Sequence, residues 1–195
     1  FDSHALPPLQ PEMLDRDDLL QALTRGHRAP TDRRLGVEFE QFVLRPDGTH
    51  VPYRGDDGVE ALLARAQELT GWAPLMEGDN LLGLKAPNGR ALTLEPGAQL
   101  EFGSSPCRTL AEVAAEVEEY CRLLATLAEE RQVGFLAVGS HPTARPEDIV
   151  RLPKKRYDVL EPWLREAGEL GLWMMKTTCG VQVNFDHEDG ADAMK

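Results

Sequence analysis

LGVEFEQFVL, residues 35–44, decides how the rest of the chain is interpreted, because it has the pattern of a β-strand that carries two carboxylates. Side chains alternate along an extended chain, so Glu38 and Glu40 point to one face while Val37 and Phe39 point to the other. The two glutamates would lie roughly 6.5 Å apart along the strand. At an effective dielectric constant of about 20, their repulsion would be on the order of 2–3 kcal/mol. A partly buried face of this kind therefore needs a positive group between the carboxylates.

Two further segments have polar faces of the same composition. The solvated face of a one-sided antiparallel sheet would show the same alternation. However, these faces hold only carboxylates and amides, and oxygen donors of this kind are the ligands that Mg²⁺ and Mn²⁺ prefer. We therefore expect a divalent cation among them, with merely solvated side chains as the alternative. The polar residues are Glu95, Gln99 and Glu101 around one turn, and Gln182, Asn184 and Asp186 near the end of the chain.

The remaining segments predict an α+β fold. Asn88-Gly89 between two alternating runs indicates a hairpin, and Thr109 with Glu112 forms a capping-box pattern ahead of a long helix. Asp57 is expected to cap another helix that ends before Gly71. Hairpins mixed with single helices predict an antiparallel or mixed sheet with helices packed on one face. The expected helices lie within residues 11–26, 57–70, 110–132 and 151–171, and the expected strands include residues 35–44, 98–103, 134–140 and 179–187.

The charge balance limits the classes of partner. The chain of 195 residues has 33 Asp and Glu against 21 Lys and Arg, a formal net charge of −12. So acidic a chain disfavours nonspecific binding to nucleic acids or anionic membranes, and no apolar run approaches membrane-spanning length. Three cysteines without CxxC spacing indicate neither a disulfide framework nor a zinc site, which fits a cytoplasmic protein. We therefore expect small-molecule partners, and association into a homo-oligomer stays open.

Two loop segments offer candidates for substrate binding. LPKKRY, residues 152–157, gathers three cations, and Arg156 is favoured because its planar guanidinium matches a carboxylate. LMEGDN, residues 75–80, places Glu77 in a loop where it could bind a substrate ammonium group. A solvated loop and an ordinary turn are the respective alternatives. The sequence has no phosphate-binding GxxxxGK[ST] loop and no convincing nucleophile–base arrangement, so a nucleotide would have to bind through metal ions on the sheet.

Several motifs, in matching order, together resemble the plant and proteobacterial type of glutamate–cysteine ligase. They are GVEFEQF, PYRGDDGVEALL, GWAPLMEGDNLLGL, LTLEPGAQLEFGSSP, LPKKRYDVLEPWL and LGLWMMKTTCGVQVNFD. This family belongs to the glutamine-synthetase-like carboxylate–amine ligases, so the resemblance implies part of a glutamine-synthetase-like catalytic sheet. It also implies that ATP and Mg²⁺ (or Mn²⁺) serve to join the γ-carboxylate of L-glutamate to the amine of L-cysteine through an acyl phosphate. That reaction is the first step of glutathione synthesis.

The resemblance also implies roles for individual residues. The matching positions make four glutamates metal ligands, two amides part of the nucleotide cleft, and two further residues contacts of the amino-acid substrate. The implied metal ligands are Glu38, Glu40, Glu95 and Glu101; the cleft residues are Gln182 and Asn184; the substrate contacts are Arg156, which is also the catalytic candidate, and Thr178.

Some positions depart from the usual motifs of the family. Lys155 stands where the PKGRY motif of the family has glycine. The family motif EPGGQFE is EPGAQLE in this chain, and the family motif RTCTVQ is TTCGVQ. Family members are also considerably longer. We therefore expect residues 1–34 to form an amino-terminal extension and helix, and residues 35–195 to form the amino-terminal part of a catalytic domain, whose activity in isolation stays open. A ligase with another amine acceptor and a noncatalytic cation- or partner-binding domain are the alternatives.

Overall fold

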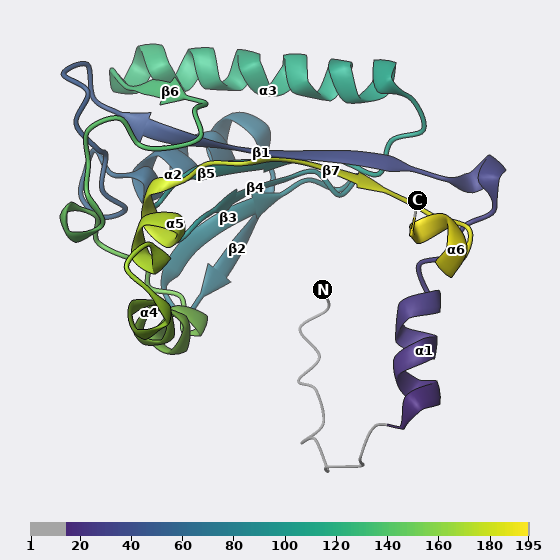
Figure 1. Cartoon of the computed structure of the whole chain (residues 1–195). Coiled ribbons are helices and arrows are strands. Elements are labelled where there is room, and N and C mark those ends of the chain that lie inside the picture. Colours follow the sequence, from purple (N-terminus) through teal and green to yellow (C-terminus); the bar gives the residue numbers. More distant parts are fainter. Residues whose placement is uncertain (1–14, 195) are drawn as a thin grey trace. The chain divides into compact units, whose positions relative to one another are not determined.

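The central element of the fold is β1, Leu35–Leu44, as the sequence predicts. The computed structural model describes residues 15–194. The strands β2-β3-β4-β5-β1-β6 lie side by side in that order, and β7 also pairs with β1, which makes a seven-stranded sheet (Figure 1). The predicted α+β class is therefore confirmed. The other strands are β2 Ala73–Glu77, β3 Asn80–Lys85, β4 Ala91–Leu94, β5 Leu100–Gly103, β6 Gly134–Leu136 and β7 Val181–Phe185.

The strand register brings part of the predicted polar face together. β1 and β5 are antiparallel, with Glu40 opposite Glu101. β4 and β5 are also antiparallel, with Thr93 opposite Glu101, and Gly83 of β3 lies opposite Thr93. One row of residues thus crosses four strands and ends on two carboxylates. β6 pairs with residues 42–44 at the far end of β1.

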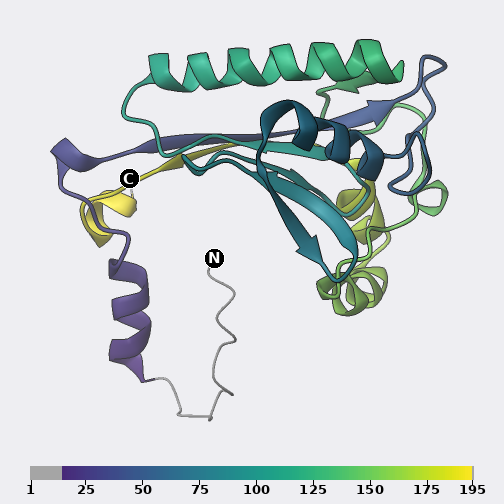
Figure 2. The ribbon, with the colours of Figure 1, turned by 180° about the vertical axis from the view of Figure 1, so that it is seen from behind.

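The opposite face of the sheet carries the hydrophobic core. Phe39 of β1 and Phe102 of β5 are cross-strand partners, and their ring centroids lie 5.3 Å apart. Tyr120 stacks on Phe102 with a centroid separation of 4.6 Å, and its hydroxyl donates to Gln41. Two helices, α2 (Val59–Thr70) and α3 (Leu110–Arg131), cover this face (Figure 2). The alternation of β1 therefore separates a core face from a polar face.

The ends of these two helices test the capping predictions. The predicted capping box is present, since the side chains of Thr109 and Glu112 each accept a hydrogen bond from the other residue's backbone N–H. α2 differs from the prediction, because its N-cap is Gly58 and not Asp57. The chain is still turning there, with the Gly58 N–H bonded to the carbonyl of residue 55. Gly71 ends α2 with a φ of 67°, as expected for a left-handed C-cap.

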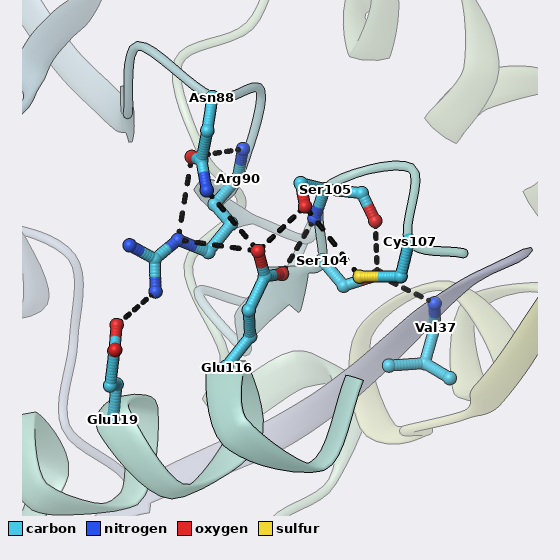
Figure 3. Close-up of polar contacts among 8 residues, drawn as sticks. All are labelled: Val37, Asn88, Arg90, Ser104, Ser105, Cys107, Glu116 and Glu119. Atoms are coloured by element: carbon cyan, nitrogen blue, oxygen red, sulfur yellow. Dashed lines mark hydrogen bonds and ion pairs between the residues drawn. The ribbon is translucent and has the colours of Figure 1, made fainter. Parts of the chain in front are cut away.

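A polar network fastens the β3–β4 hairpin to α3 (Figure 3). The hairpin turns at Asn88-Gly89 as predicted. Glu116 of α3 accepts hydrogen bonds from Asn88 Nδ2 at 3.2 Å and from the Ser105 hydroxyl at 2.6 Å. Arg90, just after the turn, pairs with Glu119 of the same helix. The network thus fixes the hairpin turn and the segment after β5 against α3, and Ser104 in that segment also accepts a hydrogen bond from the Val37 N–H of β1 at 2.9 Å.

Two elements were not predicted as they occur. Glu77 belongs to strand β2 and not to a loop, and a bulge between Leu75 and Met76 breaks the alternation that would have revealed the strand. The helix expected within residues 151–171 is α4, Arg156–Ala167, and a second helix, α5, Gly171–Thr177, follows it. Figure 1 shows α4 and α5 on the side of the sheet opposite α3.

Two histidines lie close together near the end of β1. The ring centroids of His50 and His141 are 5.8 Å apart. His141 is buried, and its Nδ1 accepts hydrogen bonds from the backbone N–H groups of Thr143 at 3.3 Å and Ala144 at 3.0 Å. Burial lowers the pKa of His50 to about 4 and also lowers that of His141. Both imidazoles are therefore neutral at neutral pH.

Contacts divide the chain into two compact units. The larger is Arg34–Asn184, and the smaller combines, among the described residues, 15–33 with 185–194. The smaller unit contains α1 (Arg16–Thr24), a 3-10 turn (Pro30–Asp32) and α6 (Gly190–Ala193). The predicted start of the first helix at residues 11–14 lies outside the described residues, and the domain boundary between residues 34 and 35 stays a prediction. Between residues 15 and 194, no helix is long and apolar enough to cross a membrane.

Candidate functional site

The candidate site includes two carboxylates that face each other, Glu40 of β1 and Glu101 of β5. Glu40 accepts a hydrogen bond from the Gly180 N–H at 2.9 Å, and the Thr93 hydroxyl donates to Glu101. Both glutamates are half-buried. Like charges directly opposite each other in an antiparallel pair are destabilising. The arrangement therefore costs free energy unless a cation lies nearby.

Glu95 is carried by the turn between β4 and β5. Its N–H donates to the Gln99 carbonyl at 2.9 Å, and the Ala98 N–H donates to the Glu95 carbonyl at 2.8 Å. Ala98 has a φ of 65°, a left-handed conformation that is uncommon for a residue with a Cβ. At Gly97, a Cβ would collide with the Lys176 carbonyl, so the turn packs too closely for any side chain there. The backbone that presents Glu95 is thus tightly constrained.

Burial and mutual repulsion raise the pKa of two of these carboxyls. Burial is the main cause of the raised pKa of Glu40; the backbone hydrogen bond from Gly180 lowers this pKa, and the charges of Glu101 and Glu38 raise it further. The pKa of Glu95 is raised by burial and by the other carboxylates, although nearby cations lower it. We call Glu40, Glu95 and Glu101 the carboxylate cluster. Its negative charge is only partly compensated by the protein.

Two cations from the LPKKRY segment flank the carboxylate cluster. Lys154 Nζ donates to the Leu94 carbonyl at 2.6 Å, and Arg156 donates through Nη2 to the Tyr157 hydroxyl at 2.8 Å. Burial and the Arg156 charge lower the pKa of Lys154, whereas the Glu95 charge raises it. The hydrogen bond to Tyr157 raises the pKa of Arg156. The site therefore combines anionic and cationic groups in a small volume.

A cavity of about 330 Å³ opens beside the carboxylate cluster. Gln99 is buried at its edge, and its Nε2 donates to the Thr178 carbonyl at 2.8 Å, which fixes the segment that follows α5. Glu101 is not part of the lining, but its charge acts on both Glu40 and Glu95. The lining includes the predicted site residues Glu40, Glu95, Arg156 and Thr178, together with the apolar side chains of Tyr157, Leu160, Leu164, Met174 and Met175.

The other predicted site residues lie outside the cavity lining. Gln182 Nε2 and Asn184 Nδ2 donate to the two carboxylate oxygens of Glu38, at 3.0 Å and 2.8 Å, so these three side chains form a group of their own. Glu77 accepts a hydrogen bond from the Lys155 N–H at 2.8 Å, at the start of α4. The roles predicted for these four residues stay predictions.

Sequence reasoning missed Lys154 and the apolar wall of the cavity. Lys154 belongs to the basic cluster of LPKKRY, but the sequence favours Arg156 because a guanidinium matches a carboxylate. Nothing in the local pattern indicates that Lys154 reaches the end of β4, since that contact spans 60 residues. The apolar wall comes from α4 and α5, whose hydrophobic residues look like ordinary core residues in the sequence.

Cys179 lies close to the cavity, but its thiol is expected to be unreactive at neutral pH. Burial, together with the charges of Glu40 and Glu95, raises the pKa of its thiol to about 12. The thiolate is the reactive form of cysteine, and almost none is present at neutral pH. Cys179 is therefore a weak nucleophile at neutral pH.

The donor set fits a hard divalent cation. Within residues 15–194, no three His, Cys, Asp or Glu side chains are gathered closely enough to form a ready-made metal site. Mg²⁺ does not need one, because it keeps several waters and binds through one or two carboxylates together with substrate phosphates. The raised pKa values of Glu40 and Glu95 mark charges that a cation would stabilise.

The cavity combines carboxylates, a guanidinium and apolar side chains within an α+β domain, and clefts with this kind of lining are typical binding sites for small molecules. Residues 34–195 match the model of glutamate–cysteine ligase family 2 (GCS2), and the chain belongs to that family. It is 38% identical over 184 residues to the chloroplastic glutamate–cysteine ligases of Brassica juncea and Arabidopsis thaliana, and 36% identical to that of Medicago truncatula. The alignments cover 94% of this chain but only 35–36% of these relatives. The resemblance found in the motifs is thus confirmed.

Proposed function

We propose that this chain supplies part of the active site of an ATP-dependent glutamate–cysteine ligase. Family membership supports the reaction class, and the relatives named above are glutamate–cysteine ligases. The observation that carries the proposal is the cavity, in which under-compensated carboxylates face an arginine. A cytoplasmic location is also proposed, because the cysteine usage fits a reducing compartment; the relatives' names give them as chloroplastic.

The proposed reaction has two steps. An oxygen of the glutamate γ-carboxylate attacks the γ-phosphorus of ATP, the bond to the bridging oxygen breaks, and ADP leaves. The cysteine nitrogen then attacks the acyl carbon of the resulting acyl phosphate, phosphate departs with its oxygen, and the nitrogen loses a proton. The product is γ-glutamylcysteine. Neither step requires a nucleophile from the protein.

In this scheme one or two members of the carboxylate cluster would hold Mg²⁺ or Mn²⁺ together with the phosphates of ATP, and Glu38 stays a further predicted ligand. A bound divalent cation would neutralise charge on the phosphoryl oxygens. Arg156 begins α4 and lines the cavity, and it is proposed to bind a substrate carboxylate there. Thr178 and Glu77 are proposed to contact the amino-acid substrate, and Gln182 with Asn184 to contact the nucleotide.

The test is ADP release by the natural polypeptide that carries this sequence. Release should require glutamate, cysteine and Mg²⁺ together. Glu40→Gln should lower turnover roughly 100-fold or more, because it removes a charge needed to bind the cation that stabilises the transferring phosphoryl group. Glu118→Gln, an exposed position on α3, serves as the control and should leave turnover unchanged. Full activity of Glu40→Gln would contradict the metal role.

Two outcomes would favour the alternatives. ADP release that depends on glutamate but needs an amine other than cysteine would identify another carboxylate–amine ligase. Calorimetry that detects no Mg²⁺-dependent ATP binding would favour a noncatalytic domain, whose polar face contacts a partner.

A further inference from the structure

Lys154 fastens the segment before α4 to the turn that carries Glu95. Two hydrogen bonds join these segments: the Leu152 N–H donates to the Pro96 carbonyl at 3.0 Å, and Lys154 Nζ donates to the Leu94 carbonyl at 2.6 Å. The two accepting carbonyls belong to the residues on either side of Glu95. The backbone at Glu95 is therefore held on both sides by residues 152–154.

The ammonium group of Lys154 is itself held in place. The Lys154 carbonyl accepts a hydrogen bond from the Tyr157 N–H at 3.0 Å, and Nζ lies 5.9 Å from the centroid of the Tyr157 ring. An ammonium has three donors, and the Leu94 carbonyl takes one of them. The charges of Glu95 and Glu101 act on the same group. The half-buried ammonium is thus hydrogen-bonded to the backbone beside Glu95, and it interacts electrostatically with Glu95 and Glu101.

We propose that Lys154 is a positioning residue that fixes the Glu95 carboxylate within the carboxylate cluster, so that the cluster can hold a divalent cation. The cation belongs to the proposed function, on which this inference rests. Removing the ammonium has two opposing effects on cation binding. Loss of a nearby positive charge alone would tighten it, whereas release of the turn weakens it. A positioning role means that the second effect is larger.

The experiment compares three variants of the 195-residue chain. Lys154→Met keeps the apolar stem of the side chain but removes the ammonium, so a role in packing alone predicts no change. Lys154→Arg restores a cationic donor. Lys155→Met is the matched control, because it makes the same substitution at the neighbouring exposed side chain.

The first measurement is amide hydrogen exchange at Glu95 and Ala98, whose N–H groups close the turn. We expect Lys154→Met to exchange roughly tenfold faster at both positions, because local opening of the turn becomes easier. Lys154→Arg should lie close to the unsubstituted chain, and Lys155→Met should equal it. Unchanged exchange in Lys154→Met would overturn the positioning role.

The second measurement is the affinity for Mn²⁺, followed by electron paramagnetic resonance. We expect Lys154→Met to bind Mn²⁺ severalfold more weakly and Lys155→Met to bind it normally. If the unsubstituted chain binds Mn²⁺ and Lys154→Met binds it equally or more tightly, the inference is wrong while the cation site stands. If the unsubstituted chain binds no Mn²⁺, the proposed cation site is wrong and the inference falls with it.

Discussion

At the scale of single residues, several residues of the candidate site have energetically unfavourable contacts or backbone conformations. Glu40 and Glu101 face each other across two strands, and Ala98 adopts a left-handed backbone in the turn beside them. Features of this kind persist only when the surrounding structure enforces them. Here the enforcing contacts are the Gly180 N–H on Glu40 and the close packing at Gly97. These positions are therefore expected to lower the free energy of unfolding.

Glu101→Gln should stabilise the chain at neutral pH. The amide oxygen can still accept from the Thr93 hydroxyl, while the repulsion with Glu40 disappears. The gain should be up to about 1 kcal/mol, the size of one unfavourable cross-strand charge pair. It should shrink as the pH falls through the raised pKa of Glu40, because protonated Glu40 no longer repels its neighbour. Urea unfolding at several pH values measures this difference, and a loss of stability at neutral pH would contradict it.

At the scale of elements, the sequence predicts those strands and helix ends that are determined by interactions between residues close together in the chain. Alternation located β1, β5 and β7 and the faces of Glu40 and Glu101, and the pair Thr109 and Glu112 located the start of α3. β2 escaped prediction because its bulge interrupts the alternation. The remaining site contacts, such as Lys154 with the end of β4 and Gln99 with the Thr178 carbonyl, join distant segments, so no local pattern encodes them.

Thr109→Ala should lower the free energy of unfolding by about 1 kcal/mol. The substitution leaves a backbone N–H in the first turn of α3 without its side-chain acceptor. Thr126→Ala, at an exposed interior position of the same helix, is the control, and it should be neutral or slightly stabilising because alanine favours helix. Thermal unfolding of both variants provides the comparison, and equal effects would show that the cap contributes nothing.

At the scale of the whole molecule, the buried groups respond to acid in opposite directions. The folded state lowers the pKa of His50, so the unfolded chain takes up a proton first as the pH falls. The neutral His50 imidazole therefore contributes fully to the free energy of unfolding above pH 6.5, and this contribution is lost as the pH falls toward about 4. Glu40 and Glu95 have raised pKa values, so their unfavourable contribution is relieved as they become protonated.

His50→Leu should flatten the pH dependence of stability between pH 6.5 and about 4. The variant has no imidazole to protonate on unfolding, which removes an acid-dependent loss on the order of 2–3 kcal/mol. Denaturant titrations at pH 7, 5.5 and 4.5 would give the free energies. An unchanged slope with pH would show that His50 is not the group responsible.

The raised pKa of Cys179 makes its thiol unreactive toward electrophiles at neutral pH. Alkylating reagents consume thiolates, so they should spare Cys179 and modify the exposed Cys121 instead. A covalent inhibitor directed at this cavity would therefore need an electrophile that reacts with a carboxylate, such as that of Glu40 or Glu95, and not with a thiol.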